Sequence, residues 1–394
     1  MFELTTQQEE TLRELETASF SEFCKRVGKD ATSYAALLGD VLIDELKTNI
    51  DALKTADHIA GDESSESLCT HFASAIKESD VFERIRIIEN HANATRLAHI
   101  IGGAPRQMIN YSYLSSLADA LRLPAPSPAN DNALRLLLDS LPLRLMWGNN
   151  FNAFVKREAL LDNIPCICVY HAITSGLKSL ARLVATAAIE LGDPFPIVIR
   201  CSDIRNDTNF KTDCREVLRA LFGEGDLLIP LHKEHTFTYR GATHMYLYTN
   251  LVSGAFDFVW LHEYGHLLRG HLVTGPSHRA EFEADEFAAA TMFRSVETFP
   301  KYEMIRATQS EAIADLVDFD RTFYLLGAAL SLAVLGLFDL SRERDSPTHP
   351  PGKARVHNVA MQYPAIDIPN FVRNVYHALN PTLRNYWGVM AKVD

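Results

Sequence analysis

Two histidines and a glutamate in one short stretch could hold a metal ion and move a proton beside it. These residues are His262, Glu263 and His266, in the order His-Glu-Tyr-Gly-His. Residues four positions apart on an α-helix lie on the same face, so both imidazoles can reach one ion. Glu263 can then act as a general base on a metal-activated water. The spacing is the HExxH pattern that indicates zinc-dependent peptide hydrolysis.

The residues around this pattern predict a buried helix. Most of its neighbours are apolar, namely Phe256, Phe258, Val259, Trp260, Leu261, Leu267 and Leu268. Gly270 follows the last apolar residues, and a glycine in that position commonly ends a helix. We therefore expect the two histidines to sit near the end of a helix in the protein core.

A catalytic zinc ion takes about three ligands from the protein, so a third ligand should follow. The segment 277–289 is rich in alanine and glutamate and predicts a second helix, with Ser277 as its N-cap. Glu281 and Asp285 are four positions apart and share one face of that helix. Glu281 could complete the metal site, and Asp285 could accept the free N–H of a ligand imidazole. The alternative is a solvated acidic helix face.

The two motifs together resemble those of gluzincin peptidases of the CAAX prenyl-endopeptidase and HtpX type. The resemblance implies that Glu281 is the third zinc ligand. A third segment, Thr348-His-Pro-Pro-Gly-Lys-Ala-Arg355, is similar to the T-H-P-P-x-x-x-R motif of that family. It implies that His349 and Arg355 line the site and help to stabilise the oxyanion. The alternative for His349 is an ordinary histidine in a proline-rich turn.

This resemblance covers about residues 240–360 and leaves the first half of the chain unexplained. Lit-like phage-exclusion peptidases and ImmA-like peptidases share the first two motifs, so they are close alternatives. Two further histidines, His271 and His278, flank the predicted metal helices, and we expect both at the surface. One zinc ion per chain is the predicted cofactor.

Composition and charge narrow the possible functions. The chain has 394 residues and a net charge of −12, which argues against general binding to nucleic acids. The first ten residues lack the features of a signal peptide, so we expect a cytoplasmic protein. Six cysteines suggest reduced thiols in the core, and we expect Cys166 and Cys168 to point to opposite faces of a strand.

One apolar segment raises the question of a membrane. Residues 322–338 are uncharged, but they fall short of the roughly 20 residues that span a bilayer. Charged residues stand on both sides of this segment. A buried helix packed behind the metal helices is the better interpretation, and a membrane location is not expected.

Hydrophobic periodicity and composition suggest how the chain is divided. Residues 1–123 predict a helical region of regulatory or substrate-recognition type, and the Pro-rich residues 124–132 predict a linker. Residues 133–394 would then form a zincin-like metallopeptidase domain. We expect helix over 176–191 and strands over 164–170, 195–200, 227–231, 236–240 and 244–249.

The last of these predicted strands has a proposed role. As an edge strand upstream of the metal helix, 244–249 could hold an extended substrate by main-chain pairing. The nearby His232, His235 and His244 are expected to take no part in metal binding. The fold class is predicted as α+β and mainly α, with a small mixed sheet and a long buried helix.

The sequence therefore predicts a zinc-dependent endopeptidase with Glu263 as general base and a protein or peptide as substrate. A selective, regulated protease of the stress or phage-defence type would account for the large N-terminal region. The alternative from a different class is a catalytically silent sensor or interaction protein, which would bind metal and use the helical N-terminal half. A purely structural metal site would not need Glu263.

Overall fold

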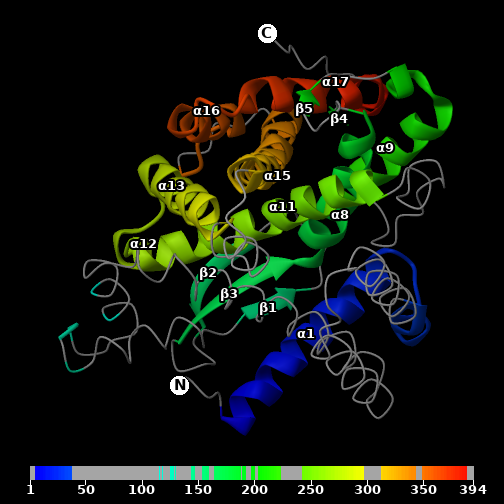
Figure 1. The fold of residues 1–394 in the computed structure, drawn as a ribbon. Helices are drawn as coiled ribbons and strands as arrows, with labels where there is room; N and C mark the ends of the chain where they lie inside the picture. Colours follow the sequence, from blue (N-terminus) through cyan, green and yellow to red (C-terminus); the bar gives the residue numbers. More distant parts are fainter. Residues whose placement is uncertain are drawn as a thin grey trace, which may run out of the picture.

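A computed structural model confirms a mainly helical α+β protein (Figure 1). The structure describes residues 5–37, 115, 118, 125–127, 129, 143–146, 153–158, 164–187, 189–191, 197–199, 203–222, 242–296, 312–342 and 348–387. The strands predicted over 227–231 and 236–240, His232 and His235, and most of the predicted linker lie outside these residues. So do most helices predicted within 1–123. The proposed division into domains stays a prediction.

The described N-terminal residues form helix α1 (Thr6–Arg26). It begins with a capping box. The Gln8 backbone N–H donates to the Thr5 hydroxyl, and the Thr5 backbone N–H donates to the Gln8 side chain. Buried side chains on and after α1 form a small separate core with Ala172, which lies outside this N-terminal segment. The N-terminal members of this core are Phe20, Phe23, Cys24, Tyr34 and Ala35. These contacts attach the N-terminal helix to the rest of the fold.

A three-stranded mixed sheet lies beside the main helices. Its strands are β1 (Leu143–Met146), β2 (Ala153–Glu158) and β3 (Ile164–Tyr170), in the order β1-β3-β2. The central strand β3 pairs parallel with β1 and antiparallel with β2. Among the described strands, β2 is therefore an edge of this sheet. The strand predicted over 164–170 and the small mixed sheet are confirmed.

The cysteine pair on β3 contradicts our expectation. Cys166 and Cys168 lie on one face of the strand, with their Sγ atoms 3.8 Å apart. Side chains alternate along a strand, so residues two positions apart share a face and the expectation misapplied that period. Both are buried free thiols. Ile167 and Val169 point the other way, into the main core.

Helices and a small hairpin follow the sheet. These elements are α8 (His171–Ala187), β4 (Ile189–Leu191), β5 (Ile197–Ile199), η2 (Asp203–Asn206) and α9 (Thr208–Leu221). Helix α8 was predicted to begin later, at residue 176, and the strand predicted over 195–200 is confirmed in its centre by β5. The amphipathic helices α8 and α9 pack against each other, and the C-terminal helix α17 (Ile368–Trp387) packs on α9.

Helix α11 (Ala242–Leu268) runs through the middle of the molecule (Figure 1). It packs against the sheet on one side and against α13 (His278–Ser295) and α15 (Ala312–Arg342) on the other. Leu251, Ala255 and Leu261 are fully buried along it. Because α11 is enclosed by other elements, side chains near its C-terminal end are held in fixed positions.

The segment 244–249, predicted as a substrate-binding edge strand, was assigned wrongly. It forms part of the first turns of α11. A short apolar run can satisfy both a strand and a helix pattern, and only its neighbours decide between them. Here Tyr248 and Leu251, three positions apart, are both buried on one helix face. The helix therefore extends about five turns before the first histidine of the motif.

Helix α15 contains the apolar segment that raised the question of a membrane. Asp318–Phe338 has the length and composition to cross one, but 78% of its most apolar window is buried inside the protein. The helix packs against α11, α13, α16 (Gly352–Gln362) and α17. The prediction of a buried helix behind the metal helices is confirmed.

Two glycines allow α11 and α15 to pack with close backbone contact. A Cβ atom on Gly254 would clash with the backbone carbonyl of Tyr324, and one on Gly327 would lie 2.5 Å from the carbonyl oxygen of Leu251. The rigid backbone supplies the obstacle in both cases, so no side-chain rotation can relieve it. The α11–α15 crossing therefore depends on these two residues.

Replacing Gly254 with alanine should destabilise the protein, because the helices must move apart or the backbone must shift. We expect the free energy of unfolding to fall by about 1–3 kcal/mol, a typical cost of overpacking. Urea unfolding followed by circular dichroism would measure it. Ser253→Ala, a half-buried position in the same turn, should stay within about 0.5 kcal/mol of the native chain. Equal stability of the two variants would contradict the tight crossing.

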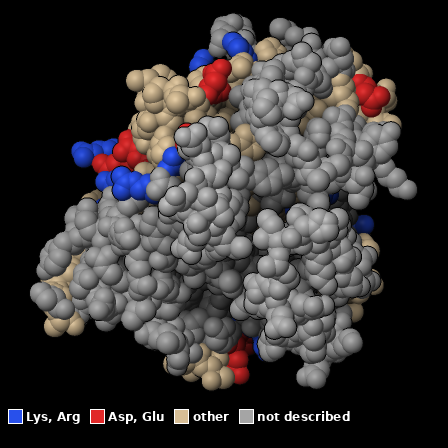
Figure 2. All heavy atoms as spheres, viewed as in Figure 1, with Lys and Arg blue, Asp and Glu red and all other residues tan. Residues whose placement is uncertain are grey.

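Charged side chains of both signs lie near one another on the face of the molecule in Figure 2. Among the described residues, ion pairs join Arg279 with Glu283 and Arg321 with Asp318. The expectation that the protein does not bind nucleic acids stays a prediction.

Candidate metal centre

The connection between α11 and α13 brings the two predicted motifs together. Gly270 has φ 75°, ends the α11 region and leads into the short helix α12 (His271–Thr274). Gly275, with φ 85°, turns the chain again. Ser277 then caps α13 by accepting a hydrogen bond from the Ala280 backbone N–H at 3.1 Å. The predicted helix stop and N-cap are confirmed.

A close helix contact lets α13 face the histidines. A Cβ atom on Gly265 would lie 2.9 Å from Cα of Ala284, so the two helices nearly touch at this point. Glu281 and Asp285, on either side of Ala284, are buried and face α11. The alternative of a solvated acidic helix face is therefore wrong for these two carboxylates.

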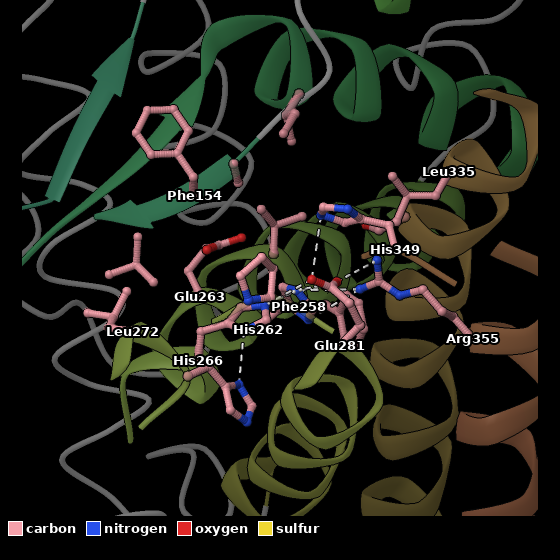
Figure 3. A pocket seen from close by; sticks show the side chains of 17 residues that line it. Phe154, Phe258, His262, Glu263, His266, Leu272, Glu281, Leu335, His349 and Arg355 are labelled. Atoms are coloured by element: carbon pink, nitrogen blue, oxygen red, sulfur yellow. Dashed lines mark hydrogen bonds and ion pairs between the residues drawn. The ribbon is translucent and has the colours of Figure 1, made fainter. Parts of the chain in front are cut away.

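Three side chains converge on one point (Figure 3). The Nε2 atoms of His262 and His266 are 3.0 Å apart, and the Glu281 carboxylate lies 3.3 Å from the first and 3.5 Å from the second. A tetrahedral ion held at about 2.0–2.1 Å needs ligand atoms about 3.3 Å from one another. The group thus has the size and the N/O donor set of a metal site. It could hold a metal ion.

An ion-pair cluster fixes His262. Its Nδ1 lies 2.9 Å from Oδ1 of Asp285, which leaves Nε2 toward Glu281. Asp285 is fully buried, and both its oxygens accept hydrogen bonds from Arg355, at 2.8 and 2.6 Å. The third guanidinium nitrogen of Arg355, Nη1, lies 3.2 Å from Glu281. The structure thus places Asp285 at Nδ1 of His262, and its role as the partner of a metal ligand stays a prediction.

Arg355 and His349 come from the C-terminal segment but differ in their surroundings. Arg355 lies in the first turns of α16 and is 5% exposed. The side chain of His349 is 60% exposed, with Nε2 3.5 Å from Glu281 and Nδ1 2.8 Å from the Thr348 hydroxyl. The structure therefore brings both residues to the metal group. His349 approaches it from the solvent-exposed side, and Arg355 approaches it from the protein interior.

Glu263 lies beside the group without joining it. Its carboxyl is buried, and burial raises its pKa to about 7, with the charges of nearby groups acting in both directions. The Val155 backbone N–H of β2 is hydrogen-bonded to this carboxyl and lowers its pKa. A carboxyl that titrates near neutral pH is well suited to accept and return a proton. Glu263 therefore has the environment of a general base.

The ionisable groups of the centre have pKa values that are shifted in different directions. Burial and the Arg355 charge disfavour protonation of His262, but hydrogen bonds with Asp285 and Glu281 raise its pKa to about 9. Burial lowers the pKa of His266 to about 3. Burial would raise the pKa of Glu281, but its contacts with His262 and Arg355 hold it well below its ordinary value. The Glu281 carboxylate is ionised.

A cavity of about 340 Å³ opens over these residues (Figure 3). Its polar lining includes the candidate metal and proton-transfer residues, together with His271 and Ser331. Apolar side chains from five elements and the α12–α13 connection form the rest of the wall, namely Phe154, Val155, Ile173, Phe258, Val259, Leu272, Pro276 and Leu335. The cavity therefore combines a reactive polar floor with an apolar wall.

His271 was expected at the surface, and that expectation is wrong. Its side chain is 7% exposed, and its Nδ1 lies 2.9 Å from Nδ1 of His266. The left-handed conformation of Gly270 turns the chain back, so that His271 faces α11 instead of solvent. A glycine directly before the histidine was the available signal. His278, in contrast, is exposed as expected.

A helical fold that holds two histidines and a glutamate together, next to a separate buried glutamate, is typical of metallopeptidase sites. Residues 228–374 match the family model of peptidase U49. The match spans all three motifs and supports a peptidase. It does not support the CAAX prenyl-endopeptidase or HtpX type in particular, and agrees better with the Lit-like alternative. No curated protein and no solved structure matched the chain.

Proposed function

We propose that the chain is a zinc-dependent endopeptidase. One observation carries this proposal: His262, His266 and Glu281 form a triangle of ligand size, and Glu263 lies beside it at the same cavity. The match to peptidase U49 supports the peptidase part independently of that geometry. A purely structural metal site would have no use for a separate buried carboxyl with a raised pKa.

His262, His266 and Glu281 would hold the ion. When bound, zinc supplies a Lewis acid that activates water and polarises the carbonyl of the scissile bond. Glu263 takes a proton from the attacking water and returns it to the leaving amine, so that the peptide bond is replaced by a carboxylate and an amine. Burial raises the pKa of this carboxyl, which favours its return of the proton after it has accepted it.

His349 and Arg355 take different parts in this proposal. His349 reaches the outer side of the metal group from an exposed position, so it can donate a hydrogen bond to the developing oxyanion. Arg355 directs its guanidinium to Asp285 and Glu281 and is a positioning residue. It fixes the carboxylate that orients His262.

Strand β2 replaces the segment 244–249 as the substrate-binding edge. Ala153, Phe154 and Val155 line the cavity, and the described part of the sheet leaves their outer side without a neighbouring strand. An extended peptide could pair with this edge by main-chain hydrogen bonds, which places its carbonyl groups beside Glu263. The apolar wall of the cavity favours apolar side chains near the scissile bond.

Withdrawal of the metal tests the proposal directly. A peptide library incubated with the purified protein should be cut, cutting should stop after treatment with a zinc chelator, and one equivalent of zinc should restore it. Mass spectrometry of the products would measure cleavage and its sequence preference. Cleavage that continues at full rate in chelated, metal-free protein would overturn the zinc-dependent mechanism.

A further inference from the structure

A second hydrogen-bonded chain leads away from the other metal-site histidine, His266. Its Nδ1 lies 2.9 Å from Nδ1 of His271, and Nε2 of His271 lies 3.1 Å from Oε2 of Glu283. The other oxygen of Glu283 accepts a hydrogen bond from Arg279 at 2.6 Å. Four side chains from α11, α12 and α13 thus form one continuous row.

Only one arrangement of protons satisfies this row when Glu283 is ionised and both histidines are neutral. A carboxylate can only accept, so Nε2 of His271 must donate to it. Nδ1 of neutral His271 then carries a lone pair and accepts from Nδ1–H of His266. That leaves Nε2 of His266 unprotonated, and this nitrogen faces His262 and Glu281. The row therefore selects the tautomer of His266 that a metal ion needs.

Each of the two metal-site histidines thus has a hydrogen-bond partner at Nδ1, but the two partners differ. His262 donates directly to Asp285, whereas a second imidazole stands between His266 and its carboxylate. Partners of ligand histidines are usually carboxylates, backbone carbonyls or water, so an intervening histidine is a specific feature of this site. The side chains of His271 and Glu283 are 7% and 26% exposed, so solvent only partly competes with the row.

We propose that His271 and Glu283 are positioning residues that fix the tautomer and ring orientation of His266 for metal binding. The proposal rests on the proposed metal site and adds to it a function for two residues that are not among the proposed ligands. His271 does not bind the ion itself, because both its nitrogens are engaged, one with His266 and one with Glu283.

The test compares zinc affinity in three variants. His271→Phe keeps the ring volume but removes both hydrogen bonds, and we expect zinc to bind about 10–100-fold more weakly, as for other outer partners of metal ligands. His271→Gln can still accept from His266 and donate to Glu283, so its affinity should recover in part. His278→Ala, which removes an exposed histidine from the same connection, should bind zinc as the native chain does. Competition with a chromophoric chelator measures all four affinities.

A measurement on the native chain keeps the test independent of how the variants fold. Nitrogen-15 spectra of the zinc-loaded protein should show a protonated Nδ1 and a metal-bound Nε2 on His266. The opposite assignment would overturn the proposal, as would native affinity in His271→Phe. Loss of affinity equal in His271→Phe and His271→Gln would also count against it, because glutamine keeps the hydrogen-bonding groups that phenylalanine lacks. Absence of zinc binding by the native chain would instead reject the metal site itself.

Discussion

Replacing Glu263 with glutamine abolishes peptide cleavage and leaves zinc bound in the mechanism proposed here. The side chain keeps its size in the buried cavity, and its amide oxygen can still accept the hydrogen bond from Val155. The amide cannot take the proton of the attacking water, and loss of a positioned general base costs about 10²–10⁴-fold in rate. Peptide turnover and zinc content per chain, measured on the same sample, give the two halves of this result.

The matched control is Glu286→Gln, which changes a carboxyl on α13 that does not line the cavity. It should keep native turnover.

Incubation of the native chain and the Glu263→Gln variant with cell lysate would further distinguish a selective protease from a general one. One protein cut only by the native chain indicates selectivity. Native turnover by Glu263→Gln would remove this residue from the mechanism.

Replacing His266 with alanine should remove the zinc ion. The variant retains only two of the three proposed ligands, so its affinity should fall by more than the roughly 10–100-fold that the loss of an outer partner costs. His262 keeps its contacts with Asp285 and Arg355, so the ion-pair cluster that holds α13 to α16 survives. We therefore expect a folded protein without stoichiometric zinc, as elemental analysis would report.

His278→Ala again serves as the control, because it removes a histidine that lies outside the cavity. Its zinc content should equal that of the native chain. Thermal unfolding of both variants without metal would show whether the fold is retained. One zinc per chain in a folded His266→Ala protein would contradict the proposed ligand set.

The sequence predicted most of the centre because its geometry is local. Histidines four positions apart on a helix must share a face, and so must Glu281 and Asp285. Arg355 and His349 could be placed only through the resemblance to a known motif, since nothing local ties them to α11. Their distances from Glu281 follow from the packing of α16 against α13 and α15.

The errors came from features that depend on distant parts of the chain. Whether 244–249 forms a strand or a helix is decided by the elements that enclose α11. The sheet edge that lines the cavity is instead β2, about ninety residues earlier in the chain. His271 reads as a surface residue until the turn at Gly270 is known. In each case the residue types were compatible with both outcomes, and tertiary packing selected one.

The buried guanidinium of Arg355 has a consequence for how the protein acquires its ion. Small zinc domains are unfolded without metal, because the free energy of metal binding supplies their folding free energy. Here Arg355 already neutralises Asp285, and a proton on His262 balances Glu281. The apoprotein should therefore reach its final shape first and be loaded afterwards. Metal binding must displace the proton from His262, so the affinity for the metal ion should fall as the pH falls.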